Sequence, residues 1–549
     1  MRLPAGLRET GGTIEKDSGL PQEHSTGQRT ILGLLSSLLL FMPCMGSLQA
    51  AEQLEVQLDG MVLPINIDDI SSWVSRHDSE GSELIIWLRL LDPVSKQGLQ
   101  KLLNASLISN RSMARQMLRS WAGLKLLDEI SDLVQVDGDK RGMIFLNTLE
   151  QLLKSQEQVT TLELLKALPA SRIRIDLDEL LKVANRWRIQ LEGHQELLKS
   201  LRGLPASSRA MPSGRHSQSL LLRQPQFISL RVKHRQAPLR LQFWKSSKSA
   251  PSRQSWVALM PGLGGAPDHF RWLAKGLSDQ GWPVVVLEHP GSDAQAVQAL
   301  LEGRRPPPGA EVLPDRLSDL SALLKAHNQG ELPIAKQQLV LMGHSLGALT
   351  AVLATGAVPH EGLEKRCQKA LDGIPLTNLS QLLQCQLTDV PLARFERPKD
   401  LTAIIGLNSF GSLLWPLKGH DLVKVPVLFA GGTLDLITPP SSEQLALLLA
   451  LSPHSLSRVI LFEGGSHFSV IQVSDNSSSS SNDDDLFRLG DDLVGIHPES
   501  VRKLLSSEIK TFLTQVEANR VLEKSHHLET DGLRMHRLNR SGIEKLPLP

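Results

Sequence analysis

The fold is decided by the stretch Leu339-Val340-Leu341-Met342-Gly343-His344-Ser345-Leu346-Gly347. Its apolar first half predicts a strand over 339–342, and the residues from 346 to 354 predict a helix. The Gly-x-Ser-x-Gly turn between them is a weak signal alone, but a strand–turn–helix context is typical of a catalytic nucleophile. The sharp turn needs small residues beside Ser345 because the flanking chain segments nearly touch. We therefore predict that Ser345 is a nucleophile at the carboxyl edge of a sheet. The alternative is a glycine-rich turn in another α/β fold.

A serine hydroxyl is a poor nucleophile without a base. The last apolar strand, expected at 459–462, ends in Glu-Gly-Gly-Ser-His, and His467 lies in that loop. His467 is therefore the predicted base, the alternative being a surface histidine. His344 lies inside the turn and is expected to point away from the site. His289 follows an earlier strand and is expected to line the pocket.

The base needs a carboxylate that fixes its tautomer and stabilises its cation. Asp435 follows the strand expected at 425–430 and is the predicted acid, the alternative being a capping or turn residue. Asp421 is a weaker candidate because it precedes that strand and would lie at the wrong edge of the sheet. The chain order Ser345, Asp435, His467 is the order of one known type of serine–histidine–acid triad.

Two backbone N–H groups are expected to bind the oxyanion. One belongs to Leu346, which follows the nucleophile. The other is expected in the loop Pro-Gly-Leu-Gly-Gly at 261–265, where small residues let the backbone approach a substrate oxygen. Leu263 is the predicted donor, and Gly264 is the fallback.

The second half of the chain alternates between apolar strands and helices. Near-continuous apolar strands of this kind predict a mainly parallel sheet with helices on both faces, an α/β fold. The first two strands join directly and are expected to form an antiparallel edge. Besides those named above, strands are expected at 227–232, 239–243, 256–260, 284–287 and 402–407, and helices at 268–280, 315–327 and 498–516.

Residues 1–50 resemble a targeting segment. Scattered positive charge precedes an apolar run from Ile31 to Met42, and small and polar residues follow as far as Ala50. This order predicts a secretory signal peptide cleaved after Ala50. An uncleaved membrane anchor and an ordinary buried helix are the alternatives. We therefore expect the protein to be exported, periplasmic or extracellular, and membrane-anchored if the segment is retained.

The segments around the sheet-forming region predict three further parts. Residues 51–190 combine a short hairpin signal with helical spacing and predict a mainly helical accessory domain. Residues 191–225 are expected to be a linker, because the stretch from 203 to 224 is rich in Pro, Ser, Arg and Gly. The hydrolase-like region is expected at 226–520, and the polar tail 521–549 is expected to be disordered.

Two segments interrupt the order of strands and helices. Residues 356–400 fall where a lid insertion would lie, and the Ser/Asp-rich stretch 474–485 is expected to be a disordered loop. Of the 3 cysteines, Cys44 would be lost with the signal peptide. Export would leave Cys367 and Cys385 in an oxidising compartment, so we predict a disulfide between them. The alternative is two buried thiols.

Composition excludes several classes of protein. The 59 Lys and Arg nearly balance the 58 Asp and Glu, which argues against a nucleic-acid binder. There is no Tyr, so no mechanism can use a phenol. No His or third Cys stands at ligand spacing from the two remaining cysteines, and the predicted chemistry needs no metal or cofactor.

The region from about 227 to 516 resembles the α/β-hydrolase superfamily, and most closely its dienelactone-hydrolase-like and platelet-activating-factor-acetylhydrolase-like members. The resemblance is carried by residues 261–264, 288–292, 343–347, 431–435 and 464–468. The whole chain is similar to predicted exported cyanobacterial hydrolases whose N-terminal domain has no assigned function. True dienelactone hydrolases use a Cys nucleophile where this chain has Ser345, so dienelactone is a doubtful substrate.

The resemblance implies an esterase or lipase-like serine hydrolase acting on a small or lipid-like carboxylic ester. An alternative is a non-catalytic hydrolase fold that serves as a binding or scaffolding module. Retention of all three triad residues and the oxyanion loop favours the enzyme. The ester, its chain length, the role of the accessory domain and the oligomeric state do not follow from the sequence.

Overall fold

The computed structural model describes residues 51–76, 84–108, 116–139, 141–156, 158–207, 223–416, 422–472, 495, 497–520 and 524–548. The predicted signal peptide, the 474–485 loop and Asp421 lie outside these residues. No helix among the described residues is long and apolar enough to cross a membrane.

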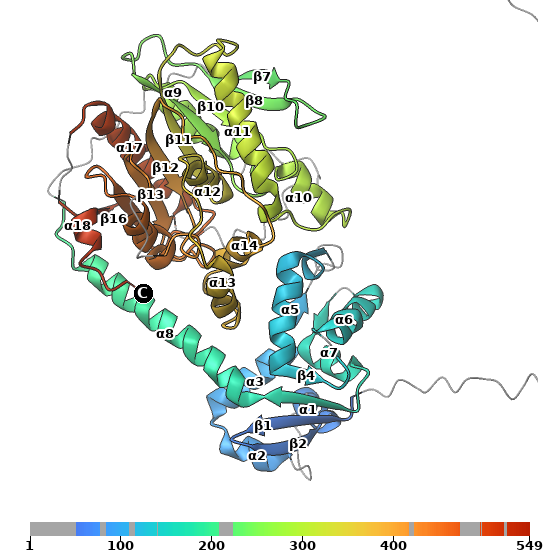
Figure 1. Cartoon of the computed structure of the whole chain (residues 1–549). Coiled ribbons are helices and arrows are strands. Elements are labelled where there is room, and N and C mark those ends of the chain that lie inside the picture. Colours follow the sequence, from blue (N-terminus) through green and yellow to red (C-terminus); the bar gives the residue numbers. More distant parts are fainter. Residues whose placement is uncertain are drawn as a thin grey trace, which may run out of the picture. The chain divides into compact units, whose positions relative to one another are not determined.

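A ten-stranded sheet forms the centre of the larger domain, in the order β15-β16-β14-β13-β12-β11-β9-β10-β8-β7 (Figure 1). Its six central strands are parallel, and an antiparallel hairpin closes each edge. All eight strands predicted from the sequence are present. The strands are β7 (Gln226–Leu230), β8 (Leu239–Trp244), β9 (Ser255–Met260), β10 (Val284–Leu287), β11 (Gln338–His344), β12 (Leu401–Leu407), β13 (Val427–Gly432), β14 (Arg458–Phe462), β15 (His526–Thr530) and β16 (Leu533–Asn539).

Helices cover both faces of this sheet (Figure 1). Side chains alternate along a strand, so Trp256 and Ala258 of β9 pack into one core while Val257 packs into the other. The first core includes α11 (Leu313–Asn328), α12 (Leu346–Leu353) and α15 (Leu447–Leu451), and the second includes α9 (Arg271–Ser278) and α17 (Pro498–Glu517). The predicted doubly covered sheet is confirmed.

The N-terminal part is mainly helical, as predicted, but it also contains a four-stranded sheet, in the order β2-β1-β6-β4. Asp59 and Gly60 both have positive φ, which suits the tight hairpin between β1 and β2. The elements are β1 (Gln53–Leu58), β2 (Met61–Asn66), α1 (Ile67–Arg76), α2 (Leu84–Leu90), α3 (Pro93–Asn104), β3 (Ser106–Ile108), α5 (Trp121–Leu133), β4 (Val134–Val136), α6 (Met143–Ser155), β5 (Val159–Thr160), α7 (Thr161–Ala167) and β6 (Arg172–Asp176).

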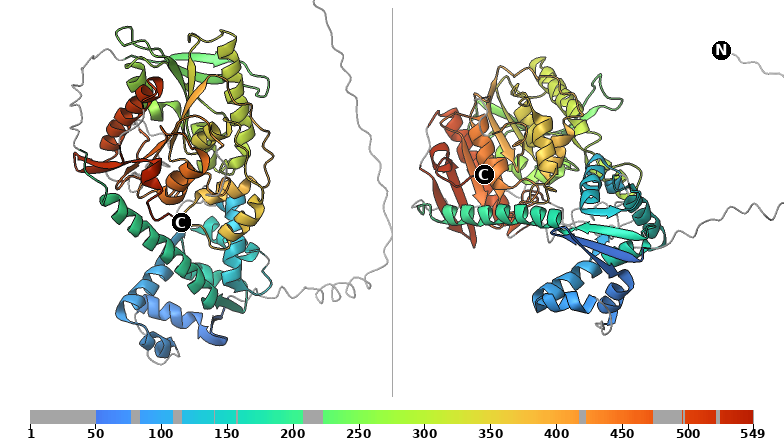
Figure 2. Two further views of the ribbon diagram at one scale, coloured as in Figure 1. Left: turned by 60° about the vertical axis from the view of Figure 1, so that its left-hand side comes forward. Right: turned by 60° about the horizontal axis from the view of Figure 1, so that its bottom comes forward.

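The predicted linker 191–225 is not a linker over its first part. Helix α8 (Leu177–Arg202) continues through it as one uninterrupted helix, drawn in teal in Figure 2. Leu197 and Leu201 of α8 are fully buried in the core of the main sheet. The helix continues this far because burial of these apolar side chains against the sheet stabilises it, and a solvated linker would lack that stabilisation.

The prediction of a disordered tail over 521–549 is wrong for the residues described. Strand β16 pairs with β14 and β15 pairs with β16, and α18 (Arg540–Ile543) follows. Leu533, Met535 and Leu538 of β16 are buried, which explains why this polar segment is ordered. After α8, the chain also pairs with β15, where Ser207 N–H donates to the His527 carbonyl at 2.8 Å.

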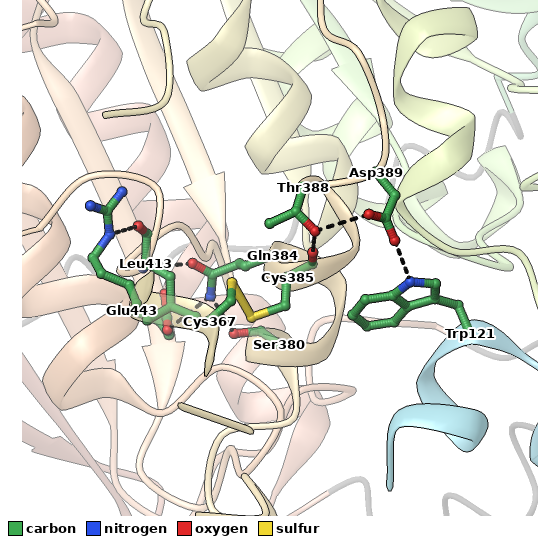
Figure 3. Close-up of a disulfide and its surroundings, with 10 residues drawn as sticks. Trp121, Cys367, Ser380, Gln384, Cys385, Thr388, Asp389, Leu413 and Glu443 are labelled. Carbon is green, nitrogen blue, oxygen red and sulfur yellow. Dashed lines mark hydrogen bonds between the residues drawn. A yellow bond between two sulfur atoms is a disulfide. The ribbon is translucent and has the colours of Figure 1, made fainter. Parts of the chain in front are cut away.

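The insertion 356–400 contains two short helices, α13 (Leu363–Leu371) and α14 (Ser380–Gln386). A disulfide joins Cys367 of α13 to Cys385 of α14, which is the pairing expected from the sequence (Figure 3). Asp389, just after α14, accepts a hydrogen bond from Trp121 Nε1 at 2.7 Å. Trp187 of α8 donates to the Ile374 carbonyl at 3.0 Å, so two N-terminal helices contact the insertion.

Replacing both cysteines by Ser is expected to lower the free energy of unfolding by about 3 kcal/mol. The disulfide closes a loop between residues 18 apart, and opening it restores conformational freedom mainly to the unfolded chain. Urea unfolding of Cys367→Ser/Cys385→Ser beside wild type measures the difference. Wild type treated with reductant is the control and should match the variant. Equal stability of the variant and oxidised wild type would contradict the prediction.

Candidate active site

Ser345 lies at the turn between β11 and α12 with φ 51° and ψ −119°. A non-glycine residue at positive φ is strained, and such strain is concentrated at functional sites. The turn holds because Ser345 N–H donates to the Leu407 carbonyl of β12 at 2.9 Å. A Cβ on Gly343 would lie 2.2 Å from the Gly347 carbonyl carbon, and one on Gly347 would lie 2.0 Å from the Met260 oxygen. The expected need for glycine at these two positions is confirmed.

The parallel strands end in register at one edge of the sheet. Gly343 of β11 is opposite Met260 of β9, and His344 is opposite Leu407 of β12. On the other side, Gly432 of β13 is opposite Phe462 of β14. The loops that carry Ser345, Asp435, His467 and the oxyanion segment therefore all leave the same edge. This is where open α/β sheets bind their ligands.

The Asp435 carboxylate is buried and fully bonded. Its Oδ1 accepts the backbone N–H groups of Ile437 at 2.9 Å and Thr438 at 2.8 Å. Its Oδ2 accepts from Asn408 Nδ2 at 2.8 Å, Thr438 Oγ1 at 2.6 Å and His467 Nδ1 at 3.0 Å. Burial raises the pKa of Asp435, but the charge of His467 and the hydrogen bonds from His467 and Thr438 outweigh it and hold the pKa below its usual value. The carboxylate is thus ionised at neutral pH.

The bond to Asp435 fixes the tautomer of His467. Because the carboxylate accepts at Nδ1, that nitrogen carries the proton and Nε2 keeps its lone pair. Among the described residues, neither His467 Nε2 nor Ser345 Oγ has a hydrogen-bond partner. The structure thus brings the predicted acid, Asp435, and the predicted base, His467, together but records no bond between His467 and Ser345. Such bonds are often long before substrate binds.

His344 does not point away from the site, contrary to the expectation from sequence. Its ring lies 4.9 Å from the His467 ring, centroid to centroid, and its Nε2 donates to the His467 carbonyl at 3.1 Å. Burial, and then the charge of His467, lower the pKa of His344 to about 3. His344 is therefore neutral and links the loop that carries His467 to the turn at Ser345.

Leu346 and Leu263, the two predicted oxyanion donors, differ from the fallback Gly264 in whether the backbone N–H group already has a hydrogen-bond partner. Leu346 is the first residue of α12, and the first N–H groups of a helix have no intrahelical partner. The Gly264 N–H donates to the Ser292 carbonyl at 2.8 Å and is not available. Within the described part of the chain, the Leu263 N–H has no such partner. This geometry favours Leu263 over Gly264 as the donor. Gly262, which precedes Leu263, lies close to the turn at Ser345, because a Cβ added to it would be 3.1 Å from Ser345 Cβ.

The insertion braces the loop that carries Asp435. The N–H groups of Leu379 and Ser380 donate to the carbonyls of Leu436 and Ile437 at 3.1 and 2.8 Å. These two donors lie at the start of α14, where helix N–H groups need outside partners. The loop that carries Asp435 is therefore held by the start of α14, which the disulfide links to α13, and no local sequence signal indicates this contact.

Buried Glu443 ties the same insertion to the loop after β12. Its Oε1 accepts from Asn378 Nδ2 at 2.7 Å, and its Oε2 accepts the Gly411 N–H at 2.8 Å. Gln384 of α14 adds a second link, because its Oε1 accepts the Leu413 N–H at 2.7 Å (Figure 3). Within the described residues, no cluster of three or more His, Cys, Asp or Glu side chains could hold a metal ion.

Three comparisons with known proteins describe what this chain is similar to. A family model described as "Alpha/beta hydrolase of unknown function (DUF1400)" matches residues 50–176, which precede the main sheet. Curated proteins give no match. The solved structure of an alpha-beta serine hydrolase homologue from Coxiella burnetii is 14% identical, covers 52% of this chain and 99% of that chain, and has a TM-score of 0.28. The chain has an α/β-hydrolase fold. The sheet order and the turn at Ser345 carry that assignment, and the cyanobacterial resemblance stays a prediction.

Acidification is expected to destabilise this hydrolase fold between pH 6.5 and 4. Burial, and then Arg316, lower the pKa of His289 to about 4, and burial lowers that of His344 to about 3. The unfolded chain therefore binds these protons before the native state does, and stability falls as pH falls. Each histidine contributes a loss of about 1.4 kcal/mol per pH unit in this window.

Urea unfolding at pH 7, 6, 5 and 4.5 measures this slope. In His344→Gln, whose amide can still donate to the His467 carbonyl, the slope should fall by about 1.4 kcal/mol per pH unit because one titrating group is removed. A wild-type stability that is constant from pH 7 to pH 4.5 would contradict the prediction.

Proposed function

We propose that the protein is a serine hydrolase that cleaves carboxylic esters through an acyl-enzyme. The observation that carries the proposal is the 3.0 Å hydrogen bond between His467 Nδ1 and Asp435 Oδ2 at the sheet edge where Ser345 forms a strained turn. A buried carboxylate, an oriented imidazole and a serine in this arrangement are the components of acyl transfer.

In acylation, Ser345 Oγ attacks the ester carbonyl carbon as its proton passes to His467 Nε2. Asp435 stays ionised and stabilises the imidazolium that forms. The N–H groups of Leu263 and Leu346 bind the oxyanion of the tetrahedral intermediate, and each such donor contributes about 3–4 kcal/mol to transition-state stabilisation. The intermediate collapses when the C–O bond to the alcohol breaks and His467 returns the proton to that oxygen.

In deacylation, a water takes the place of the alcohol. His467 removes its proton while the water oxygen attacks the acyl carbon, and Ser345 leaves with the proton from His467.

The side chains that flank Asp435 favour an ester with an apolar group, because Leu434 is 54% and Leu436 56% exposed. Apolar side chains exposed at one site favour contact with an apolar group, because that contact removes apolar surface from water.

A fluorophosphonate probe is expected to add once to wild type and not to Ser345→Ala, read by intact mass. Asp435→Asn should react about 10³–10⁴-fold more slowly, because the amide no longer holds the reactive tautomer of His467. A labelled wild type then justifies a screen of p-nitrophenyl esters of increasing acyl length.

Ser249→Ala is the matched control, because Ser249 is exposed after β8, and it should label like wild type. Folded wild type that takes up no probe would contradict the proposal and favour a hydrolase fold used as a binding module.

We also propose that the protein is exported. The Cys367–Cys385 disulfide supports this, because disulfides persist mainly in oxidising compartments. The expected result of N-terminal sequencing of exported protein is a start at Ala51. A start near Met1 on membrane-bound protein would instead favour an uncleaved anchor and overturn the cleavage.

A further inference from the structure

A cluster of buried charge lies behind the oxyanion loop and takes no part in the chemistry proposed above. Arg316 and Asp319 are one helical turn apart on α11, and each is 1% exposed. Asp319 accepts from Arg235 Nε at 2.6 Å and Nη2 at 2.8 Å, and from His289 Nδ1 at 2.9 Å. His289 is thus a partner of Asp319, not the pocket-lining residue expected from the sequence.

The charge of this cluster is well defined. Burial raises the pKa of Asp319, but bonds from His289 and Arg235 lower it to about 2, so the carboxylate is ionised. Burial lowers the pKa of Arg316 to about 9, and the nearby Asp319 charge opposes that shift. Replacing buried ions by apolar side chains is often neutral or stabilising, so stability alone does not account for a buried guanidinium here.

Arg316 contacts both segments that define the oxyanion loop. Its Nη2 donates to the Pro261 carbonyl, at the start of the loop. Its Nη1 donates to Ser292 Oγ at 2.7 Å, and the Ser292 carbonyl in turn accepts the Gly264 N–H at 2.8 Å. One guanidinium therefore fixes the loop directly at one end and through Ser292 at the other. Leu263 lies between these two anchors.

The loop packs closely against the turn at Ser345. A Cβ on Gly262 would lie 3.1 Å from Ser345 Cβ and 2.9 Å from His344 Nδ1, so the backbone there is already in close contact. An oxyanion donor acts only when its N–H lies about 2.7–3.1 Å from the developing charge. A loop displaced by a fraction of an ångström would lose this distance.

We propose that Arg316 is a positioning residue of the oxyanion hole, whose two hydrogen bonds hold the Leu263 N–H at the distance that the transition state requires. This inference rests on the serine-hydrolase function proposed above. It assigns to Arg316 a role in the rate of the chemical step, exerted through the loop and without contact with substrate.

The test compares Arg316→Met and Arg316→Lys with wild type on a p-nitrophenyl ester. For Arg316→Met we expect kcat to fall about 10–100-fold, less than the loss of a whole oxyanion donor, with KM within about threefold. Arg316→Lys should recover part of kcat, because an ammonium can restore one of the two bonds. The pH dependence of kcat/KM should not change, since the Asp435–His467 pair is untouched.

Arg458→Met is the matched control. Arg458 is fully buried at the start of β14, and the candidate site lies at the other end of the parallel strands. The Nη1 of Arg458 donates to Gln515. It should lose stability but keep kcat. Equal kcat values for Arg316→Met and wild type would overturn the inference, as would an equal fall in kcat in Arg458→Met.

If Arg316→Met does not fold, Ser292→Ala tests the proposed role of Arg316 instead. It removes the Oγ anchor of Arg316 but leaves the Ser292 carbonyl, and we expect kcat to fall several-fold with Tm near that of wild type. An unchanged kcat in Ser292→Ala would then overturn the inference. The proposed function fails separately, because in that case wild type itself takes up no fluorophosphonate.

Discussion

The close approach of three backbone segments around Ser345 is the constraint on which the site depends. Gly347 lies against the Met260 carbonyl, Gly343 lies against Gly347, and Gly262 lies against Ser345 itself. No side chain fits at these three contacts. Ser345 has a positive φ at this point, and Gly262 in the loop after β9 lies beside it. One packing arrangement thus includes the proposed nucleophile and the two segments that carry the proposed oxyanion donors.

A connected series of polar contacts runs from Asp435 to the N-terminal part of the chain. Five hydrogen bonds reach its two oxygens, and the loop that follows it is bound by the start of α14. Helix α14 is linked in turn to α13 through the disulfide and to α5 through Asp389 and Trp121. The N-terminal part therefore contacts the element that supports the acid loop.

The sequence predicts those parts of the fold whose signals are local. Apolar strands, the turn around Ser345 and the loops bearing Asp435 and His467 could be located because each follows its own strand. The roles of Asn408, His344 and Arg316 could not, because they depend on residues far away in the chain. Strands β15 and β16, in the segment expected to be disordered, could not be predicted for the same reason, since the alternating side chains of β16 become informative only beside β14. The sequence predicts a linker from residue 191 although α8 continues to Arg202, because the burial of the last turns of α8 is a tertiary effect.

The pairing of Ser207 with β15 affects how separate molecules behave toward one another. An outermost strand with unpaired backbone groups is a template on which another chain can add a strand. In this protein the segment that follows α8 occupies part of that position, through bonds between Ser207 and His527 and between His527 and Pro205. The connection between the two parts of the chain thus also covers part of this edge, which disfavours the addition of a strand from another molecule at β15.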